Sequence, residues 1–197
     1  MIVIAALFCG GDHLGSQAPV RVRVQTALGD IVVEVDQAKA PVTAANFLRY
    51  VDAGHYDGGN WHRTVKMDNQ PESPVKIEVI QAGVNQERTK DGFPAIALER
   101  TNTTGLLHKD GVISMARGAP DSATSGWFIC INDQPSLDFG GARNPDGQGF
   151  AAFGRVVAGM DVVRKIQAAP SASTRTTNAE AQRLTPPIAV LKVARIK

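Results

Sequence analysis

The sequence predicts one mainly β domain, a closed barrel of antiparallel strands with two helices. Many short apolar segments are bounded by Gly, Pro, Asn or Asp, which is typical of strands joined by tight turns. Only two segments have the apolar spacing of a helix, so layers of alternating strands and helices are not favoured. The first and last strand candidates can pair and close the sheet. With 197 residues, the chain is long enough for one domain with a substantial core.

The N-terminal part of the domain is predicted to be a hairpin followed by a helix. Residues 20–24 alternate apolar and polar side chains, as a half-buried strand does, and residues 31–35 form a second strand candidate. Leu-Gly-Asp at 28–30 is typical of the turn that would join them. Pro41 then opens a run with helical apolar spacing, and Gly54 ends it.

The rest of the chain supplies short strands and a second helix. Six further strand candidates are residues 61–65, 77–81, 95–98, 111–116, 127–131 and 151–157. A helix is expected at residues 160–168, where Asp161 lies in the first turn and suits the helix dipole. Residues 188–196 form the last strand candidate. Residues 168–182 are polar and rich in Ser and Thr, so we expect an exposed loop there.

Composition and charge argue against several function classes. The 21 Lys and Arg against 19 Asp and Glu give a net charge of +2, so no strong field would recruit nucleic acid or an anionic membrane. The four histidines and the loop aspartates lack metal-ligand spacing, and the glycine-rich segment 139–149 lacks a phosphate-loop pattern. Neither a metal nor another cofactor is therefore expected. No serine has the context of an activated nucleophile, so a hydrolase is not favoured.

The first 18 residues are expected to lie outside the domain, which we place at residues 19–197. Residues 2–9 form an apolar run far shorter than the roughly 20 residues that a bilayer span needs, so no stable span is predicted. Ser-Gln-Ala at 16–18 offers a small-x-small cleavage pattern. This indicates a signal peptide and a periplasmic or otherwise exported protein. A cytoplasmic protein with an N-terminal extension is the alternative.

Strand alternation groups the side chains that could form a site. Successive residues of a strand point to opposite faces. Three sets are therefore expected to share a face each: Trp61, Arg63 and Val65; Ile77, Val79 and Gln81; Gly126, Phe128 and Cys130. If these faces converge, the site combines an apolar floor with one cation and one amide. Such groups are poorly suited to hydrolysis, but they suit a small apolar ring attached to an amide.

Four segments in order resemble the cyclophilin family of peptidyl-prolyl cis–trans isomerases. They are Gly-His-Tyr-Asp-Gly-Gly-Asn-Trp-His-Arg at 54–63, Val-Ile-Gln at 79–81, Gly-Val-Ile-Ser-Met-Ala at 111–116 and Ser-Gly-Trp-Phe-Ile at 125–129. The resemblance covers most of the chain from residue 20 onward. It implies a closed, mainly β barrel of eight antiparallel strands with two helices capping its ends. It also implies an isomerase without cofactor that assists protein folding, and proline-containing unfolded or flexible polypeptides as partners. We also expect a monomer.

Rotation about an X-Pro peptide bond fits this set of groups. The barrier arises from the double-bond character of the C–N bond and approaches about 20 kcal/mol. Lowering it requires only that the twisted amide is bound more tightly than either planar form. In the twisted state the proline nitrogen becomes a better hydrogen-bond acceptor. An arginine donor aimed at that nitrogen would therefore stabilise the transition state.

The resemblance implies a role for each matching position. Arg63 corresponds to the catalytic arginine, and Gln81 corresponds to the glutamine that holds the substrate backbone. The positions matching the peptide-binding surface are Val79, Ala116, Arg117, Phe128, Leu137 and Phe150. The family usually has methionine at the first of these positions and histidine at the last.

Three departures from the family pattern leave a second function open. An insertion at residues 66–76 separates Arg63 from Gln81, and its polar composition predicts that it shapes client choice and contributes little to the core. Glu78 stands where the family usually has a pocket phenylalanine, and Gly126 replaces a glutamine. Retention of Arg63 favours the enzyme. The changes at Glu78 and Gly126 favour a non-enzymatic module that docks proline-containing segments.

Overall fold

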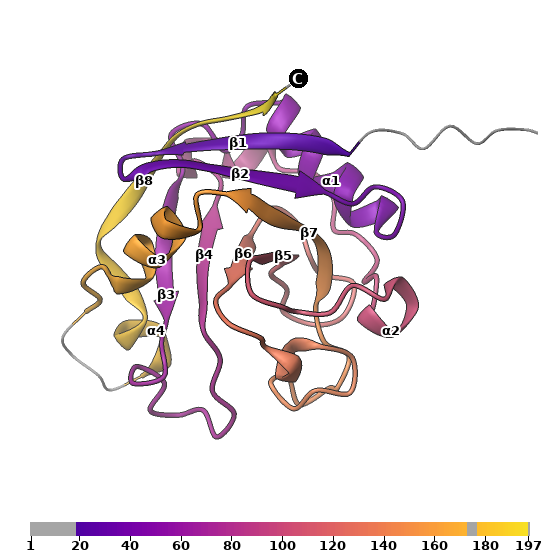
Figure 1. Ribbon diagram of the computed structural model, residues 1–197, viewed down its shortest axis with the longest axis vertical. Helices are drawn as coiled ribbons and strands as arrows, with labels where there is room; N and C mark the ends of the chain where they lie inside the picture. Colours follow the sequence, from indigo (N-terminus) through magenta and orange to yellow (C-terminus); the bar gives the residue numbers. More distant parts are fainter. Residues whose placement is uncertain (1–18, 173–176, 197) are drawn as a thin grey trace, which may run out of the picture.

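The protein is a closed barrel of eight antiparallel strands, shown in Figure 1 as a computed structural model that describes residues 19–172 and 177–196. Around the barrel the strands follow the order β1-β2-β7-β5-β6-β4-β3-β8. The strands are β1 Val20–Thr26, β2 Gly29–Val35, β3 Asn60–Val65, β4 Val79–Gly83, β5 Val112–Met115, β6 Trp127–Cys130, β7 Ala151–Ala158 and β8 Arg183–Ile196. The predicted fold class is confirmed.

The first and last strands close the barrel, as the sequence predicts. β1 pairs with β2 on one side and with β8 on the other, where Arg21 lies opposite Ile196 and Val24 lies opposite Val193. Val22 and Val24 are fully buried, while Arg23 between them is exposed. Closure through this pairing leaves no free sheet edge at either strand.

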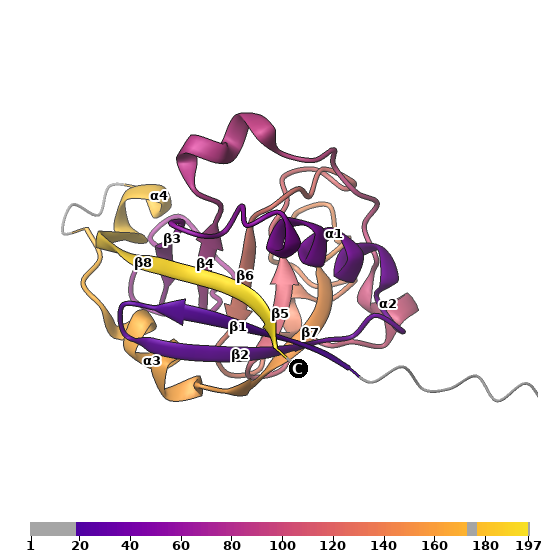
Figure 2. The same ribbon diagram turned by 90° about the horizontal axis from the view of Figure 1, so that it is seen from above.

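Two helices cover the barrel, and Figure 2 shows them on opposite sides of it. α1, Pro41–Asp52, buries Phe47 and Leu48, and α3, Met160–Ala168, buries Val163 and Ile166. All four side chains join one core cluster with the inward residues of the strands. The largest fully buried side chains of this cluster form a network of ring contacts and are Phe47, Tyr50, Tyr56, Trp61, Trp127 and Phe153. Both predicted helices are confirmed.

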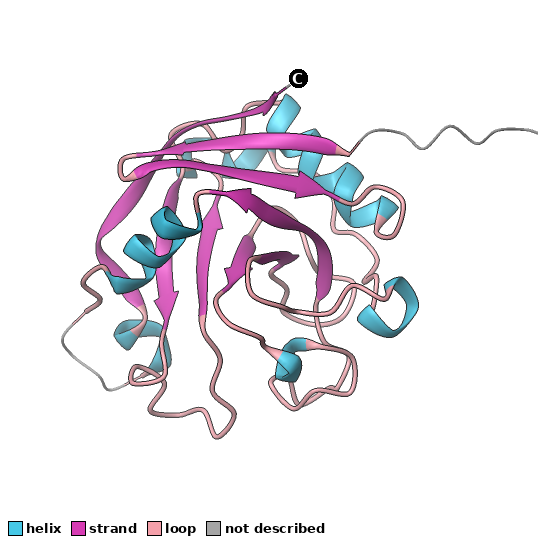
Figure 3. Cartoon of the chain, in the orientation of Figure 1, coloured by secondary structure: helices cyan, strands magenta, loops and turns pink. Residues whose placement is uncertain are grey.

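Two local predictions are wrong. Residues 95–98 form no strand, since Ile96 makes a single bridge to Ala123 and the Leu98 N–H donates to the Asp121 carboxylate instead of to a neighbouring strand. The predicted loop 168–182 contains a short helix, α4, Asn178–Ala181, and β8 starts directly after it at Arg183. The remaining short helices are α2 Thr101–Thr104, η1 Gln86–Asp91 and η2 Pro135–Leu137, which Figure 3 shows among the loops.

The cause of α4 is visible in the sequence. Thr177 and Glu180 have the spacing of a capping box, and the Thr177 hydroxyl accepts a hydrogen bond from the Glu180 N–H. The predicted signal segment 1–18 lies outside the described residues. Across the part of the chain that the structure describes, we find no helix with the length and apolar character needed to cross a membrane.

Candidate active site

A bulge in β3 separates Arg63 from the core. Trp61 pairs with Ala82, but Arg63 pairs with Gln81, so the strand carries one residue more than its partner between these pairs. The extra residue, His62, reverses the alternation. Trp61 therefore lies in the barrel core, whereas Arg63 lies on the outer face with Gln81. The prediction that Trp61 and Arg63 share a face is wrong for this reason.

Arg63 is held by two glutamine side chains. Its Nη1 donates to Gln81 Oε1 at 2.8 Å, and its Nε and Nη2 donate to Gln182 Oε1 at 2.9 and 2.6 Å. Burial, with a smaller effect of Arg143, lowers the pKa of Arg63 to about 10. The guanidinium is still protonated at neutral pH. A fixed cation with neutral partners keeps its full charge for a ligand.

Gln182 is the site residue that the sequence did not reveal. It follows α4, is fully buried, and its Nε2 donates to the Asn69 carbonyl at 3.1 Å. Its amide thus links Arg63 to the insertion 66–76. It lies 119 positions from Arg63, in a segment predicted to be an exposed loop. No local pattern in the sequence indicates that it is buried.

An apolar cluster outside the barrel core lies beside this pair. Its members are Val65, Ile77, Val79, Phe128, Cys130 and Leu137, with the partly exposed Ala116 and Phe150 packed against them. Phe128 is opposite Gln81 on the neighbouring strand, so Arg63, Gln81 and Phe128 form one row across β3, β4 and β6. The predicted convergence of a cation, an amide and an apolar floor is therefore present.

The rings of the cluster have defined partners. Phe128 meets Phe150 edge-on, with 5.4 Å between ring centroids. Phe128 is only 5% exposed and Leu137 only 1%. Ala116 and Phe150 are more exposed and form the accessible rim of the cluster.

The side chain of Arg117 has a structural role. It donates to the Gly149 carbonyl at 2.8 Å and makes two hydrogen bonds to the Asp146 carboxylate, while its guanidinium lies 5.1 Å from the centre of the Phe150 ring. These contacts fasten the segment 139–149 beside the rim. Its side chain is therefore committed within the protein, which leaves only its backbone for peptide contact.

Ile77, not Glu78, fills the position next to Val79 in the cluster. Glu78 accepts hydrogen bonds from Asn132 and Gln167, so its carboxylate is directed to α3 and the β6 turn. Ile77 is buried among the cluster residues instead. The apparent loss of the pocket phenylalanine at Glu78 is thus compensated in part by the preceding apolar residue.

The backbone at Gly126 has room for a side chain, since an added Cβ would lie 3.5 Å from the Ala116 Cβ, an ordinary contact distance.

A buried Ser-His-Asp chain lies behind Phe128. His108 Nε2 is 2.9 Å from the Ser114 hydroxyl, and its Nδ1 is 2.7 Å from Asp138. Ser114 and His108 thus have the spacing of a nucleophile and its base, a pair that the sequence did not indicate. However, Ser114 is fully buried and His108 stacks on Phe128 at 6.2 Å. The chain supports the apolar floor, and its hydroxyl cannot reach a substrate.

The insertion 66–76 is partly core, contrary to the sequence-based expectation. Asn69 and Gln70 are 1% and 2% exposed. Gln70 bonds both the N–H and the carbonyl of Ile77, and Arg143 donates to Gln70 and to the Val75 carbonyl. The insertion therefore positions the entry to β4, because its buried amides satisfy backbone groups that water cannot reach.

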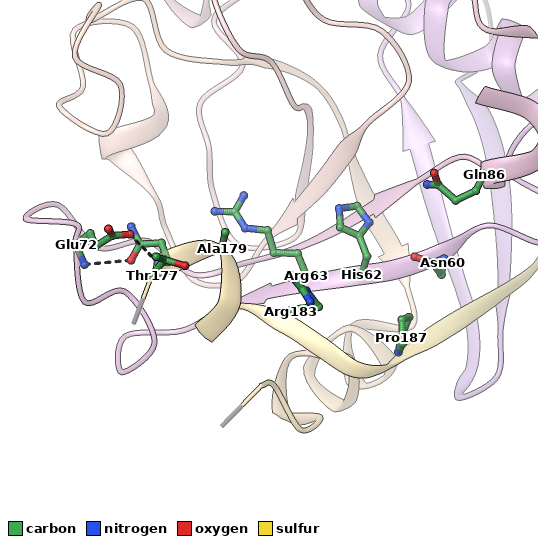
Figure 4. Close-up of a pocket in the computed structure, with 10 residues that line it drawn as sticks. Asn60, His62, Arg63, Glu72, Gln86, Thr177, Ala179, Arg183 and Pro187 are labelled. Atoms are coloured by element: carbon green, nitrogen blue, oxygen red, sulfur yellow. Dashed lines mark hydrogen bonds between the residues drawn. The ribbon is translucent and has the colours of Figure 1, made fainter. Parts of the chain in front are cut away.

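A groove of about 690 Å³ lies on the other side of Arg63 from the apolar cluster. Figure 4 shows its lining side chains, which come from β3, the insertion, the start of η1 and the segment from Thr177 to Pro187. β3 lies between β4 and β8, so Arg63 belongs to both regions. His62 also lines the groove, and burial lowers its pKa.

Comparison with known proteins identifies the family. The profile of the cyclophilin-type peptidyl-prolyl cis–trans isomerases matches residues 21–194. The chain belongs to this family. This cyclophilin is 34% identical to a peptidyl-prolyl cis–trans isomerase of Streptomyces antibioticus over 155 residues, which are 78% of this chain and 87% of the relative. It is also 34% identical to one of Acinetobacter baylyi over 176 residues, 88% of this chain and 86% of the relative.

A solved cyclophilin shares the fold at lower sequence identity. The enzyme of Cryptosporidium parvum superposes with a TM-score of 0.69 at 20% identity, covering 91% of this chain and 98% of its own. The cyclophilin described here is therefore a peptidyl-prolyl cis–trans isomerase, which acts on proline-containing peptides. The predicted enzyme is confirmed, and the non-enzymatic binding module is not favoured.

Proposed function

We propose that this cyclophilin accelerates X-Pro rotation through Arg63, with Gln81 holding the substrate backbone. The observation that carries the proposal is the row of Arg63, Gln81 and Phe128 across three neighbouring strands. The proline ring packs at the rim of Ala116 and Phe150, above the buried floor. The amide then lies between an apolar surface and a fixed cation. A solved relative from Cryptosporidium parvum was crystallised in the presence of the dipeptide Ala-Pro, a ligand of this class.

Arg63 acts on the twisted amide more than on the planar one. Rotation removes the resonance that ties up the nitrogen lone pair, so the nitrogen accepts a hydrogen bond only near the transition state. The guanidinium loses little freedom in forming that bond, because two glutamines already hold it. Protons are shared but not transferred, and the only bond that changes is the partial double bond of the amide.

The first prediction concerns Arg63. Arg63→Ala should lower kcat/KM for a proline tetrapeptide by about 10²-fold, which is about 3 kcal/mol of transition-state binding. Arg63→Lys should recover little, because an ammonium lacks the planar fork that contacts both glutamines. The matched control is Arg155→Ala, a change at an exposed arginine on β7. The measurement is isomerisation followed by a protease-coupled assay. Parental turnover by the alanine variant would refute the assignment.

The wider role that we propose is folding assistance by an exported monomer acting on unfolded or flexible polypeptides. Export is supported by the apolar run 2–9 and the small-x-small pattern at 16–18. Mass spectrometry of the protein from separated cell fractions tests the proposed export. A chain beginning after residue 18 in an exported fraction supports it, and a full-length cytoplasmic chain contradicts it. Light scattering of the purified protein tests the monomer.

A further inference from the structure

The groove beside Arg63 contains a second arginine, which lies directly opposite Arg63 on the neighbouring strand. Arg63 on β3 pairs with Arg183 on β8, so their side chains leave the same face of neighbouring strands. Both line the groove of about 690 Å³, together with His62, Glu72 and Pro187. Figure 4 shows that the groove continues from Arg63 along β3 and β8. A polypeptide whose proline lies at Arg63 would therefore extend into it.

The charges in the groove are not balanced by the protein. Among the described residues, the exposed Arg183 guanidinium has no hydrogen-bond or ion-pair partner. Arg63 donates only to neutral glutamines. The acid of the groove, Glu72, accepts a hydrogen bond from the Asn178 N–H at 2.7 Å and forms no ion pair with either arginine. Two like charges opposite each other on adjacent strands are unfavourable, and a carboxylate between them would relieve this.

We propose that this groove is a subsite for an acidic residue of the client, bound by Arg183 and located within about three residues of the isomerised proline. The inference rests on the proposed role of Arg63. Neighbouring strands are about 4.8 Å apart and an extended peptide advances about 3.3–3.6 Å per residue. A carboxylate on a residue close to the proline thus reaches the second arginine while the proline stays at the first.

The preference is expected to be modest. Arg183 is exposed, and ion pairs in contact with solvent contribute little, so an acidic residue should improve kcat/KM by about two- to fivefold at low salt. Salt should reduce the preference, because charges exposed to solvent are screened. A preference of this size selects among client sequences without preventing release of the product.

The test compares peptide pairs that differ only in Glu against Gln. The acid is placed at each of the three positions on either side of the proline, and isomerisation is followed by NMR exchange, which avoids the sequence preference of a coupling protease. The parent should favour Glu at one or more positions by about two- to fivefold. Arg183→Gln should reduce this ratio to about one, and Arg183→Glu should transfer the preference to Lys peptides. Arg155→Gln is the matched control and should keep the parental ratio.

The outcomes distinguish the subsite from the catalytic assignment. Catalysis by the parent with equal rates for Glu and Gln peptides at every position overturns the subsite alone. A Glu preference that survives Arg183→Gln also overturns it, because another cation would then bind the acid. Failure of the catalytic assignment is seen separately, as undiminished turnover of the Gln peptides by Arg63→Ala. Circular dichroism of each variant shows whether the barrel is intact.

Discussion

Gln182 governs the direction in which Arg63 points. Its single carbonyl oxygen accepts from both Nε and Nη2 of the guanidinium, while its amide nitrogen is tied to Asn69. Removing the acceptor leaves two partly buried donors unpaired and frees the guanidinium to rotate. Arg63 itself touches the reacting amide in our proposal, so Gln182 is a positioning residue.

Gln182→Ala should therefore lower kcat/KM about tenfold, mainly through kcat, because the lost orientation affects the transition state most. Gln182→Glu should restore only part of this loss, since a carboxylate still accepts from Arg63 but partly offsets its charge and cannot donate to Asn69. Steady-state kinetics of the two variants measure the effect. A purely structural role would be shown by equal losses in both variants, parallel to a loss of thermal stability.

Individual site residues differ in how well the sequence predicts them. Arg63, Gln81 and Phe128 lie within short motifs on adjacent strands, so alternation and resemblance indicate them together. The bulge at His62 is not visible in the alternation, because one extra residue changes a face without changing composition. Gln182 is not indicated by the sequence because it ends a segment whose composition is mainly polar, and only the folded chain reveals that its amide is buried.

At the scale of elements, the insertion 66–76 is the segment whose contribution to the core is least visible in the sequence. Gln70→Ala should lower the free energy of unfolding by about 1–3 kcal/mol, because it leaves buried backbone groups of Ile77 and Lys66 without a partner. Pro71→Ala, at the exposed neighbouring position, is the control and should cost far less. Urea denaturation measures both. Equal stability of the two variants would mean that the insertion is dispensable, as its composition predicts.

The segment 139–149 should respond to acid through Asp146. Hydrogen bonds from Arg117 and from the Gln148 N–H lower the pKa of this carboxyl to about 2. A lowered folded-state pKa gives stability that is present above the unfolded value near pH 4 and is lost as the pH falls toward about 2. Asp146→Asn should therefore flatten the decline in melting temperature over that range. An unchanged difference between variant and parent from pH 5 to pH 2 would contradict this.

Elements with a regular pattern were predicted most accurately. The helix at residues 160–168 has the predicted bounds, since its apolar spacing and the acid in its first turn indicate the same helix start and length. Residues 95–98 have the composition of a strand, but their neighbours on the folded chain offer only one bridging partner and a carboxylate. Strand formation depends on a partner strand, which a local pattern cannot supply.

The whole molecule depends on the pairing of β1 with β8. Arg21 lies opposite Ile196, so the described ends of the domain are adjacent and antiparallel. A circular permutant that joins the termini by a short flexible linker and opens at the exposed Ala38–Lys39 bond should fold and remain active. The same linker with the opening between Ile113 and Ser114, inside β5, should not fold. Circular dichroism measures whether each permutant folds, and the isomerase assay measures its activity. If the first permutant did not fold, the order of β1 and β2 in the chain would be essential.

The overall architecture was predictable because several weak signals agree. Short strands, few helices and complementary end strands each permit other folds, yet together they favour a closed sheet. The sequence could not show how the outer face of β4 and β6 is covered. That depends on the loops 66–76 and 139–149, which meet through Arg143 and Gln70.

The β1–β8 contact also has a consequence for how the protein is made. β1 leaves the ribosome before the other strands of the barrel, and its partner β8 is the last of the eight to be translated, so the barrel cannot close until β8 has been made. Until then β1 has one unpaired edge, which can pair with another nascent strand. During its own synthesis this isomerase is therefore itself an incompletely folded chain in need of protection.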